Sequence, residues 1–386
     1  MKPEEIQNAV EAIYNKAVEY RRALHRSPEI GMECKETQKF ICNVLEEHGI
    51  EYRALEVSGV IASIIGTAGK SEKCVMLRAD HDALRVEEKT GLDYQSEIPG
   101  RMHACGHDLH TAMLLCAAII LQENASAFAG EVRLLFQPGE EISEGALYMI
   151  ENGALDGVDI GLGIHADPLL PSGTISARSG ADWAGVDRYH INISGVQAHG
   201  ATPHKGKDPV VCACALVNAL QTIVSRRIDP LQPVVVTVGQ IHAGSAYNII
   251  PETAFLEGTC RSFSQEVQKS LPGIFEEIAS NVAAAYGCKA EVVFDNTAGP
   301  LVNDNSAFGL FCESAQKVLT RAEITSREPE MIGEDFAEYA ERVPCIFAHL
   351  GCDGGAPLHS PYVNFKEEAM KTGIALEVQF TLDALK

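Results

Sequence analysis

Apolar segments that end in reactive side chains are the feature of this sequence that most restricts its architecture. Residues 59–66 and 73–80 are apolar along almost their whole length, and residues 131–137 and 158–164 are also predominantly apolar. Such segments are typical of strands covered by helices on both faces. Helical patterns separate them along the chain, so we expect an α/β domain in which helices flank a mixed sheet.

Reactive side chains stand at the ends of three of these expected strands, at residues 80–82, 140–141 and 165. In open α/β sheets, ligands bind at the carboxyl ends of the strands. The positions of these residues therefore predict one site, built from segments that are far apart in the sequence.

The segment 102–110, Met-His-Ala-Cys-Gly-His-Asp-Leu-His, is the strongest local indication of a metal site. In an extended backbone Cys105 and His107 would point the same way, and thiolate and imidazole suit a borderline-soft ion such as zinc. Asp108 is expected at the N-cap of the apolar helix that follows, where its carboxylate could accept the free N–H of a ligand histidine. Alternatively, this is a polar loop over a core helix.

Two further features fit hydrolytic chemistry. The side chains of Glu140 and Glu141 would diverge in an extended backbone, so one could bind a metal while the other acts as a base toward water. His165 follows a strand, and His359 lies beside a glycine-rich segment at 351–357. The alternatives are a solvated acidic turn for the glutamates and structural roles for the histidines.

The pattern of elements changes after Trp183 and predicts an inserted domain. It follows the β-α-β-β-α-β order of ferredoxin-like folds. The domain would span residues 184–296, leaving 1–183 and 297–386 as a discontinuous catalytic domain. The expected elements of the insert are strands 187–196, 233–242, 254–262 and 288–294 and helices 208–227 and 264–286. After the insert we expect helices 304–320, 334–342 and 366–385 and strand 344–350.

Composition excludes several classes of partner. The 386 residues carry a formal charge of −22, which opposes binding to nucleic acid and to anionic membranes. Twelve cysteines lack a regular spacing, no apolar run is long enough to span a bilayer, and the first residues do not resemble a signal peptide. We therefore expect a cytoplasmic protein with reduced thiols.

Motifs along nearly the whole chain resemble those of the dimetal amidohydrolases. This family includes hippurate hydrolase, N-acyl-amino-acid deacylases and auxin-conjugate hydrolases, and it is related to aminoacylase and the co-catalytic zinc carboxypeptidases. Each motif is weak alone, but their shared order is specific. They lie at residues 22–29, 77–80, 102–110, 137–141, 163–165, 195–199, 248–251, 258–261, 333–336 and 358–361.

The resemblance implies a site, a cofactor and a partner. Glu140 would be the general base and acid, His199 would steady the oxyanion from the partner subunit, and Asn248 and Arg261 would hold the substrate. The inserted domain would be a lid that forms a homodimer. The substrate would be a small N-acyl amino acid. The implied ligands of two divalent ions, which could be zinc, manganese, cobalt or nickel, are Cys105, which would bridge them, His107, Glu141, His165 and His359.

Two residues depart from the family pattern. His81 directly precedes Asp82, and strand alternation turns it away from the expected site, so we do not count it as a ligand. Arg85 replaces a proline of the family and would alter the rim of the site. Two alternatives stay open: a metal-dependent dipeptidase or carboxypeptidase on the same scaffold, and a non-catalytic binding protein. Retention of Glu140 and all five expected ligands disfavours the second.

Overall fold

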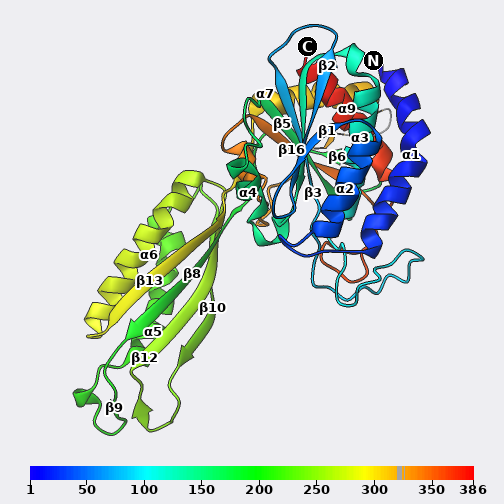
Figure 1. Ribbon diagram of the computed structural model, residues 1–386. Coiled ribbons are helices and arrows are strands. Elements are labelled where there is room, and N and C mark those ends of the chain that lie inside the picture. The colour runs from blue at the N-terminus through cyan, green and yellow to red at the C-terminus, as the bar shows by residue number, and fades with distance from the viewer. Residues whose placement is uncertain (320–323, 326) are drawn as a thin grey trace. The chain divides into compact units, whose positions relative to one another are not determined.

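The computed structural model describes residues 1–319, 324–325 and 327–386, and the chain divides into two compact units (Figure 1). The first unit contains Met1–Gly180, Val302–Glu328 and Asp335–Lys386, and the second contains Ala181–Leu301 and Pro329–Glu334. The insertion expected at 184–296 lies inside the second unit. The short return segment was not expected from the sequence; it joins that unit because the Ala184 N–H donates to the carbonyls of Glu330 (3.2 Å) and Ile332 (2.8 Å).

The first unit is built on a mixed sheet, as predicted. Within the described residues its strand order is β1-β2-β4-β3-β5-β16-β6-β15. The central strands β4, β3, β5 and β16 are mutually parallel, whereas β2 and β6 run antiparallel to their central neighbours. The carboxyl ends of the four central strands therefore share one edge. The strands are β1 (Glu51–Ala54), β2 (Val60–Thr67), β3 (Cys74–Asp80), β4 (Ala129–Gln137), β5 (Ile160–Asp167), β6 (Ile175–Ser176), β15 (Ile324–Thr325) and β16 (Cys345–Gly351).

Helix α3 is the central helix of this unit. All its residues from His107 to Leu121 are buried, because it packs on β3 and β5 and against α1 and α9. This burial explains why its sequence is apolar all round rather than on one face. The helices of the unit are α1 (Pro3–Arg26), α2 (Lys35–Glu47), α3 (His107–Glu123), α4 (Gly145–Glu151), α7 (Asn305–Val318), α8 (Ala337–Ala340) and α9 (Ala369–Ala384).

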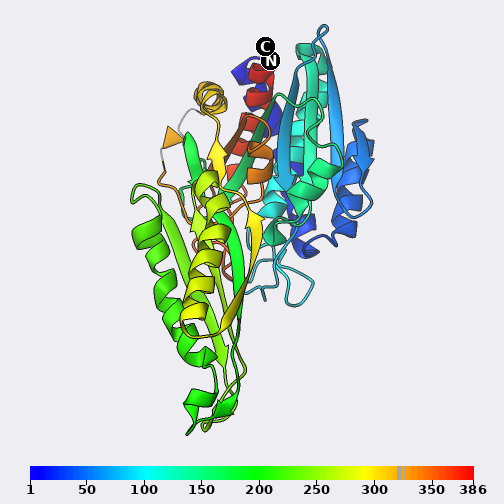
Figure 2. The same cartoon turned by 90° about the vertical axis from the view of Figure 1, so that its left-hand side faces the viewer.

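The second unit has the predicted β-α-β-β-α-β order. Its antiparallel sheet has the strand order β10-β12-β8-β13, which is the ferredoxin-like arrangement. Helices α5 and α6 lie on the same side of this sheet (Figure 2). The elements are β8 (Gly185–Ser194), α5 (Pro209–Leu220), β10 (Val234–Ala243), β12 (Thr253–Ser262), α6 (Gln265–Ala285) and β13 (Lys289–Ala298). Within this unit β9 (Ala198–His199) pairs with β11 (Ile249–Ile250), and elsewhere along the chain β7 (Gly180–Trp183) pairs with β14 (Leu301–Asn303).

Several predicted elements differ from the structure. Strand β1 was missed because all four of its residues are exposed, so no apolar alternation marks it. The helix expected at 208–227 ends at Leu220 and is followed by a π-helical turn over Ile223–Arg227. The helix expected at 334–342 is reduced to α8, and Asp335, which precedes it, accepts the backbone N–H of Ala146 with its carboxylate. The helix expected at 304–320 ends at Val318, and position 320 lies outside the described residues.

Among the helices that the structure describes, none combines the length and apolar character needed to cross a membrane.

Candidate metal centre

The reactive residues predicted at strand ends gather at the shared edge of the central strands. Asp80 is the last residue of β3, and the segment that carries Glu140 and Glu141 follows β4. His165 was expected to follow its strand but lies within β5, which continues to Asp167. Here the prediction was wrong by a few residues, because the strand continues past its apolar run.

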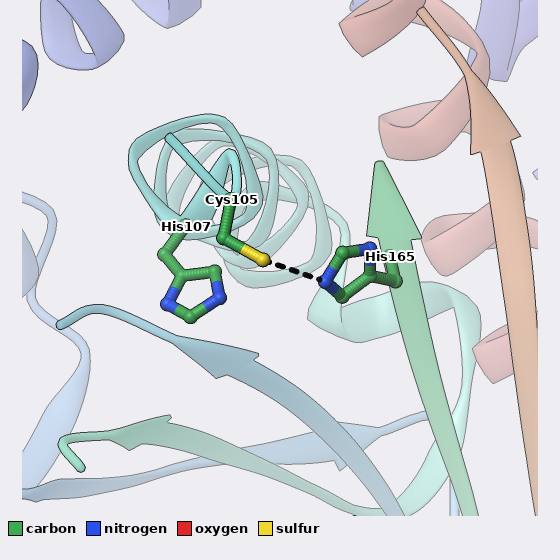
Figure 3. A group of neighbouring side chains, drawn as sticks. All are labelled: Cys105, His107 and His165. Atoms are coloured by element: carbon green, nitrogen blue, oxygen red, sulfur yellow. Dashed lines mark hydrogen bonds between the residues drawn. The ribbon is translucent and has the colours of Figure 1, made fainter. Parts of the chain in front are cut away.

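Cys105, His107 and His165 form the buried centre of this group (Figure 3). One potential ligand atom from each lies within 4.8 Å of the others. The Cys105 Sγ and the His165 Nε2 point toward one another across 3.5 Å. Cys105 comes from the loop before α3, His107 is the first residue of α3 and His165 comes from β5. Three separate elements thus bring their side chains to one point.

The loop that carries Cys105 is not extended, in contrast to the prediction. Gly106 between Cys105 and His107 adopts a left-handed conformation with φ of +89°. A Cβ atom here would lie 3.1 Å from the Ala166 Cβ and 3.2 Å from the Phe365 ring. Glycine is therefore required both for the backbone angle and for the close approach.

Glu140 and Glu141 also depart from the expected extended backbone. They lie in a 3₁₀ turn, Glu140–Ile142, that follows Gly139 at φ +69°. The Asp82 carboxylate fixes this turn by accepting the backbone N–H groups of Glu140 (3.0 Å) and Glu141 (3.3 Å). Both glutamates face the buried His107: its Nε2 lies 3.8 Å from the Glu140 Oε2 and 4.0 Å from the Glu141 Oε1.

His359 completes the group from the loop after β16. Its Nε2 lies 3.5 Å from the Glu141 Oε1, and the same two residues form a candidate ligand set with Cys105. His359 is a non-glycine residue at φ +64°, and its backbone N–H donates to the Ala104 carbonyl at 2.9 Å. Such conformations cost on the order of 1–3 kcal/mol, and they tend to occur where a site requires them.

The electrostatics of the centre fit a bound cation. Burial by itself lowers the pKa of the His107 imidazole, yet Asp80, Asp82 and Glu141 raise it to about 10. Burial raises the pKa of the Cys105 thiol well above its usual value, and Glu141 and Glu140 raise it further. In the part of the chain that the structure describes, neither ring nitrogen of His107 nor the Glu141 Oε1 has a hydrogen-bond partner. Buried polar atoms without partners, surrounded by carboxylates, match the donor set of a divalent metal.

The role predicted for Asp108 was wrong. Gly106 occupies the N-cap of α3 and Asp108 lies inside the helix. The Asp108 carboxylate is held by Arg21 (2.9 Å) and His25 (2.8 Å), so it does not support a ligand histidine. The carboxylate nearest to the His107 Nδ1 is that of Asp82, whose Oδ1 lies 3.5 Å away.

No role for Asp82 in supporting the candidate ligands was predicted from the sequence. Asp82 comes two residues after Asp80, the last residue of the buried strand β3, and this position was the signal that could have indicated a supporting role. His81 is buried, and neither of its ring nitrogens has a hydrogen-bond partner among the described residues. It belongs to none of the candidate metal groups found there, and burial lowers its pKa to about 3.

The three candidate residues of the inserted domain lie within the second unit. His199 in β9 pairs with Ile249 of β11, next to the exposed Asn248. The His199 Nδ1 accepts the N–H of Ala201 at 3.1 Å, so the ring carries its proton on the exposed Nε2. Arg261 is half-buried in β12 and donates to the hydroxyl of Thr259 and to the Cys260 carbonyl (2.9 Å). The structure thus brings His199 and Asn248 together and places Arg261 on a separate sheet.

Comparison with known proteins gives consistent matches over nearly the whole chain. Residues 76–383 match the family described as Peptidase family M20/M25/M40. The sequence is 45% identical over 352 residues to the N-acetyl-L-cysteine deacetylase of Bacillus subtilis, covering 91% of this chain and 83% of the relative. It is 37% identical to the IAA-amino acid hydrolase ILR1-like 2 of Arabidopsis thaliana, covering 97% and 86%.

A solved structure matches equally fully. The Bacillus subtilis YXEP protein, described as a dinuclear metal binding peptidase from the M20 family, superposes with a TM-score of 0.86 at 33% identity. The match covers 97% of this chain and 99% of that chain.

Proposed function

This chain belongs to peptidase family M20/M25/M40, and we propose that it hydrolyses the amide bond of small N-acyl amino acids, releasing a carboxylic acid and a free amino acid. Relatives named as a deacetylase of an N-acetyl amino acid and as an amino-acid-conjugate hydrolase support this substrate class. The observation that carries the proposal is the overlap of three candidate ligand groups, each with its ligand atoms within 4.8 Å of one another. They are Cys105, His107 and His165; His107, Glu140 and Glu141; and Cys105, Glu141 and His359.

The proposed cofactor is a pair of divalent ions. The residues that would hold them are Cys105, His107, Glu141, His165 and His359. When bound, such ions polarise the substrate carbonyl and lower the pKa of a bound water. Zinc, manganese, cobalt and nickel all suit a set of thiolate, imidazole and carboxylate ligands.

Glu140 is the proposed general base and general acid. The Glu140 Oε2 lies 3.8 Å from the His107 Nε2. The hydrogen bond from the Glu140 backbone N–H to the Asp82 carboxylate holds the turn that directs the Glu140 side chain toward His107. From this position Glu140 takes a proton from water and passes it to the nitrogen of the leaving amine. Because Glu140 is not one of the proposed ligands, its carboxylate can carry out this transfer.

The inserted domain supplies the proposed substrate contacts. Reaching the partner subunit's site, the His199 Nε2–H would donate to the oxyanion of a tetrahedral intermediate, because its Nδ1 is already an acceptor. Asn248 and Arg261 would hold the substrate, with the Arg261 guanidinium forming a forked contact with a carboxylate. The half-burial of Arg261 would strengthen such a contact by excluding water.

The proposed partner is a second copy of the chain, joined through the inserted domain acting as a lid. Strand β10 is an edge strand of its sheet, and Val235 and Ile241 on it are exposed. A cavity of about 360 Å³ lies between β10 and α5 and is lined partly by Val217 and Val238. An unpaired edge beside apolar side chains suits pairing with an identical edge.

A cytoplasmic location is part of the same proposal. All cysteines in the described residues are free, which suits a reducing compartment.

The decisive experiment replaces Glu140 with glutamine. Activity on N-acetyl and N-benzoyl amino acids, with dipeptides assayed beside them, should fall by about a thousandfold or more, since proton transfer and water activation are both lost. The bound metal, measured by elemental analysis, should stay at the wild-type level. Glu144→Gln, which changes an exposed carboxylate four residues away, is the matched control. Undiminished turnover by Glu140→Gln would refute the role of Glu140. Faster hydrolysis of dipeptides than of N-acyl amino acids by the wild type would support the peptidase alternative.

A further inference from the structure

His110 lies one turn of α3 beyond His107 and is buried. Asp80, His107 and His110 have potential ligand atoms within 4.8 Å of one another, which by itself could suggest a further metal site. However, both ring nitrogens of His110 are already engaged. Its Nδ1 lies 2.6 Å from the Asp80 Oδ1, and its Nε2 lies 2.8 Å from the Ala166 backbone nitrogen. His110 therefore has no lone pair left for a metal.

These two bonds determine where the proton of His110 lies. A backbone N–H can only donate, so the Nε2 of His110 accepts from Ala166 and the ring proton is on Nδ1. That Nδ1–H donates to Asp80, whose other carboxylate oxygen accepts from Arg78 at 2.6 Å. Arg78 is in turn bonded to Asp335 at 2.8 Å. His110 is thus held by an ion network anchored in the buried strand β3.

The Ala166 residue connects His110 to His165. The Ala166 carbonyl lies 2.8 Å from the His165 Nδ1, and a carbonyl can only accept. The proton of His165 is therefore on Nδ1, which leaves the lone pair of Nε2 directed toward Cys105 (Figure 3). The two imidazole rings also pack against each other, with centroids 4.8 Å apart and planes inclined by 61°.

We propose that His110 is a positioning residue for His165: by holding the Ala166 backbone, it fixes the orientation and tautomer in which His165 offers its Nε2 lone pair to a metal. This inference rests on the proposed role of His165 as a ligand. Outer groups that orient a ligand histidine typically change metal affinity by about 10–100-fold when removed. His110 is thus a determinant of one metal position without touching the metal.

The first test needs no substitution and no metal. Nitrogen-15 NMR of histidine-labelled metal-free protein reports the tautomer of each ring. We expect the Nδ1–H tautomer for both His110 and His165. An Nε2–H tautomer at either residue would overturn the inference.

The second test measures metal affinity. Metal-free wild type should bind Co²⁺ in two steps, followed by calorimetry and by the visible absorption of the bound ion. His110→Phe keeps a ring but lacks both nitrogens, and it should weaken one step by about 10–100-fold while leaving the other within about threefold. His165 in this variant should also show a mixture of tautomers.

His103→Phe is the matched control, since His103 is an equally buried histidine two residues before Cys105 whose ring nitrogens have no hydrogen-bond partner in the described chain. His110→Gln, whose side-chain amide has a donor group and an acceptor group, should keep most of the affinity that His110→Phe loses. Equal effects of His110→Phe and His103→Phe would contradict the inference. Two-step binding with no amidohydrolase activity in the wild type would instead contradict the proposed function and leave the role of His110 intact.

Discussion

The Asp82 carboxylate accepts the backbone N–H groups of both Glu140 and Glu141, at 3.0 Å and 3.3 Å. One buried side chain thus sets the direction of the proposed base and of a proposed ligand. Asp82 also lies 3.5 Å from the His107 Nδ1, so it reaches a second proposed ligand. Its position links the end of β3 to the turn after β4.

Asp82→Asn should therefore impair both metal binding and turnover. An asparagine has one side-chain acceptor instead of two, so one N–H of the turn loses its partner and the ring of His107 is less well fixed. We expect kcat and metal affinity each to fall by about 10–100-fold, as when outer groups of metal sites are removed. Asp93→Asn, at an exposed aspartate, is the control. Wild-type metal affinity in Asp82→Asn would show that the turn keeps its geometry without this carboxylate.

Gly106→Ala should damage the site by a steric route. The added Cβ would meet Ala166 at 3.1 Å and the Phe365 ring at 3.2 Å, at a φ of +89° that disfavours any side chain. We expect a loss of about 1–3 kcal/mol in the free energy of unfolding and at least a tenfold loss of metal affinity.

Gly91→Ala separates the backbone cost of Gly106→Ala, which comes from the positive φ, from the steric cost of the added Cβ. Gly91 has a similarly positive φ of +71°, but nothing lies within 4 Å of the position of its Cβ. In Gly91→Ala the free energy of unfolding should fall by about 1 kcal/mol and the metal affinity should stay at the wild-type level. Thermal melting and calorimetry measure the two quantities. Equal metal affinity in both variants would show that the packing around Gly106 does not control the site.

The sequence indicated which edge of the sheet the candidate residues share better than it indicated their local backbone geometry. Apolar strands ending in Asp80 and near Glu140 and His165 indicated one edge of a sheet, and this edge exists because the central strands are parallel. The local predictions assumed extended backbone, and left-handed turns at Gly106 and Gly139 replace it. Those turns depend on tertiary contacts, such as the packing of Gly106 on Phe365, that no local pattern reveals.

The sequence also did not indicate which residues pair with the buried charges. Asp108 precedes an apolar run in the manner of an N-cap, yet Arg21, far away in α1, binds it. Pairings of this kind follow from how α1 and α3 pack. The spacing of residues along the chain does not specify that packing.

Metal binding should release protons. In the metal-free protein the pKa of His107 is raised to about 10, and burial raises the pKa of the Cys105 thiol well above its usual value. Both groups are therefore protonated at pH 7, and both must lose a proton to act as ligands, so about two protons should leave per pair of ions. Affinity should consequently rise with pH.

Calorimetry of Mn²⁺ binding in buffers with different ionisation enthalpies measures this release directly. Cys105→Ser should reduce it by about one proton, because a serine hydroxyl does not ionise in this range. Chelation of the metal should also lower the melting temperature, since a ligand that binds only the native state stabilises it. Affinity that is constant from pH 6 to pH 8 would show that neither group is protonated in the metal-free protein.

The buried Asp187 of the inserted domain should make the stability of that domain depend on pH. Burial raises the pKa of its carboxyl to about 6, although the hydrogen bond from Gln268 (3.1 Å) and the charge of Arg261 lower it in part. Because the pKa in the folded state exceeds the ordinary value of 3.8, the folded state holds the proton more tightly than the unfolded state does. The corresponding stability is complete below about pH 4 and is lost as the pH rises through about 6.

Asp187→Asn should remove this dependence, because asparagine is neutral at every pH and can still accept from Gln268. Relative to wild type, the variant should gain about 1–2 kcal/mol above pH 7 and gain nothing near pH 4. Denaturant unfolding at pH 4, 5.5 and 7.5, followed through the inserted domain, tests the sign as well as the size. Asp295→Asn, at an exposed aspartate of β13, is the control for a change in net charge. A variant less stable than wild type at pH 7.5 would mean that the ionised carboxylate of Asp187 is stabilised by Arg261 more strongly than burial disfavours it.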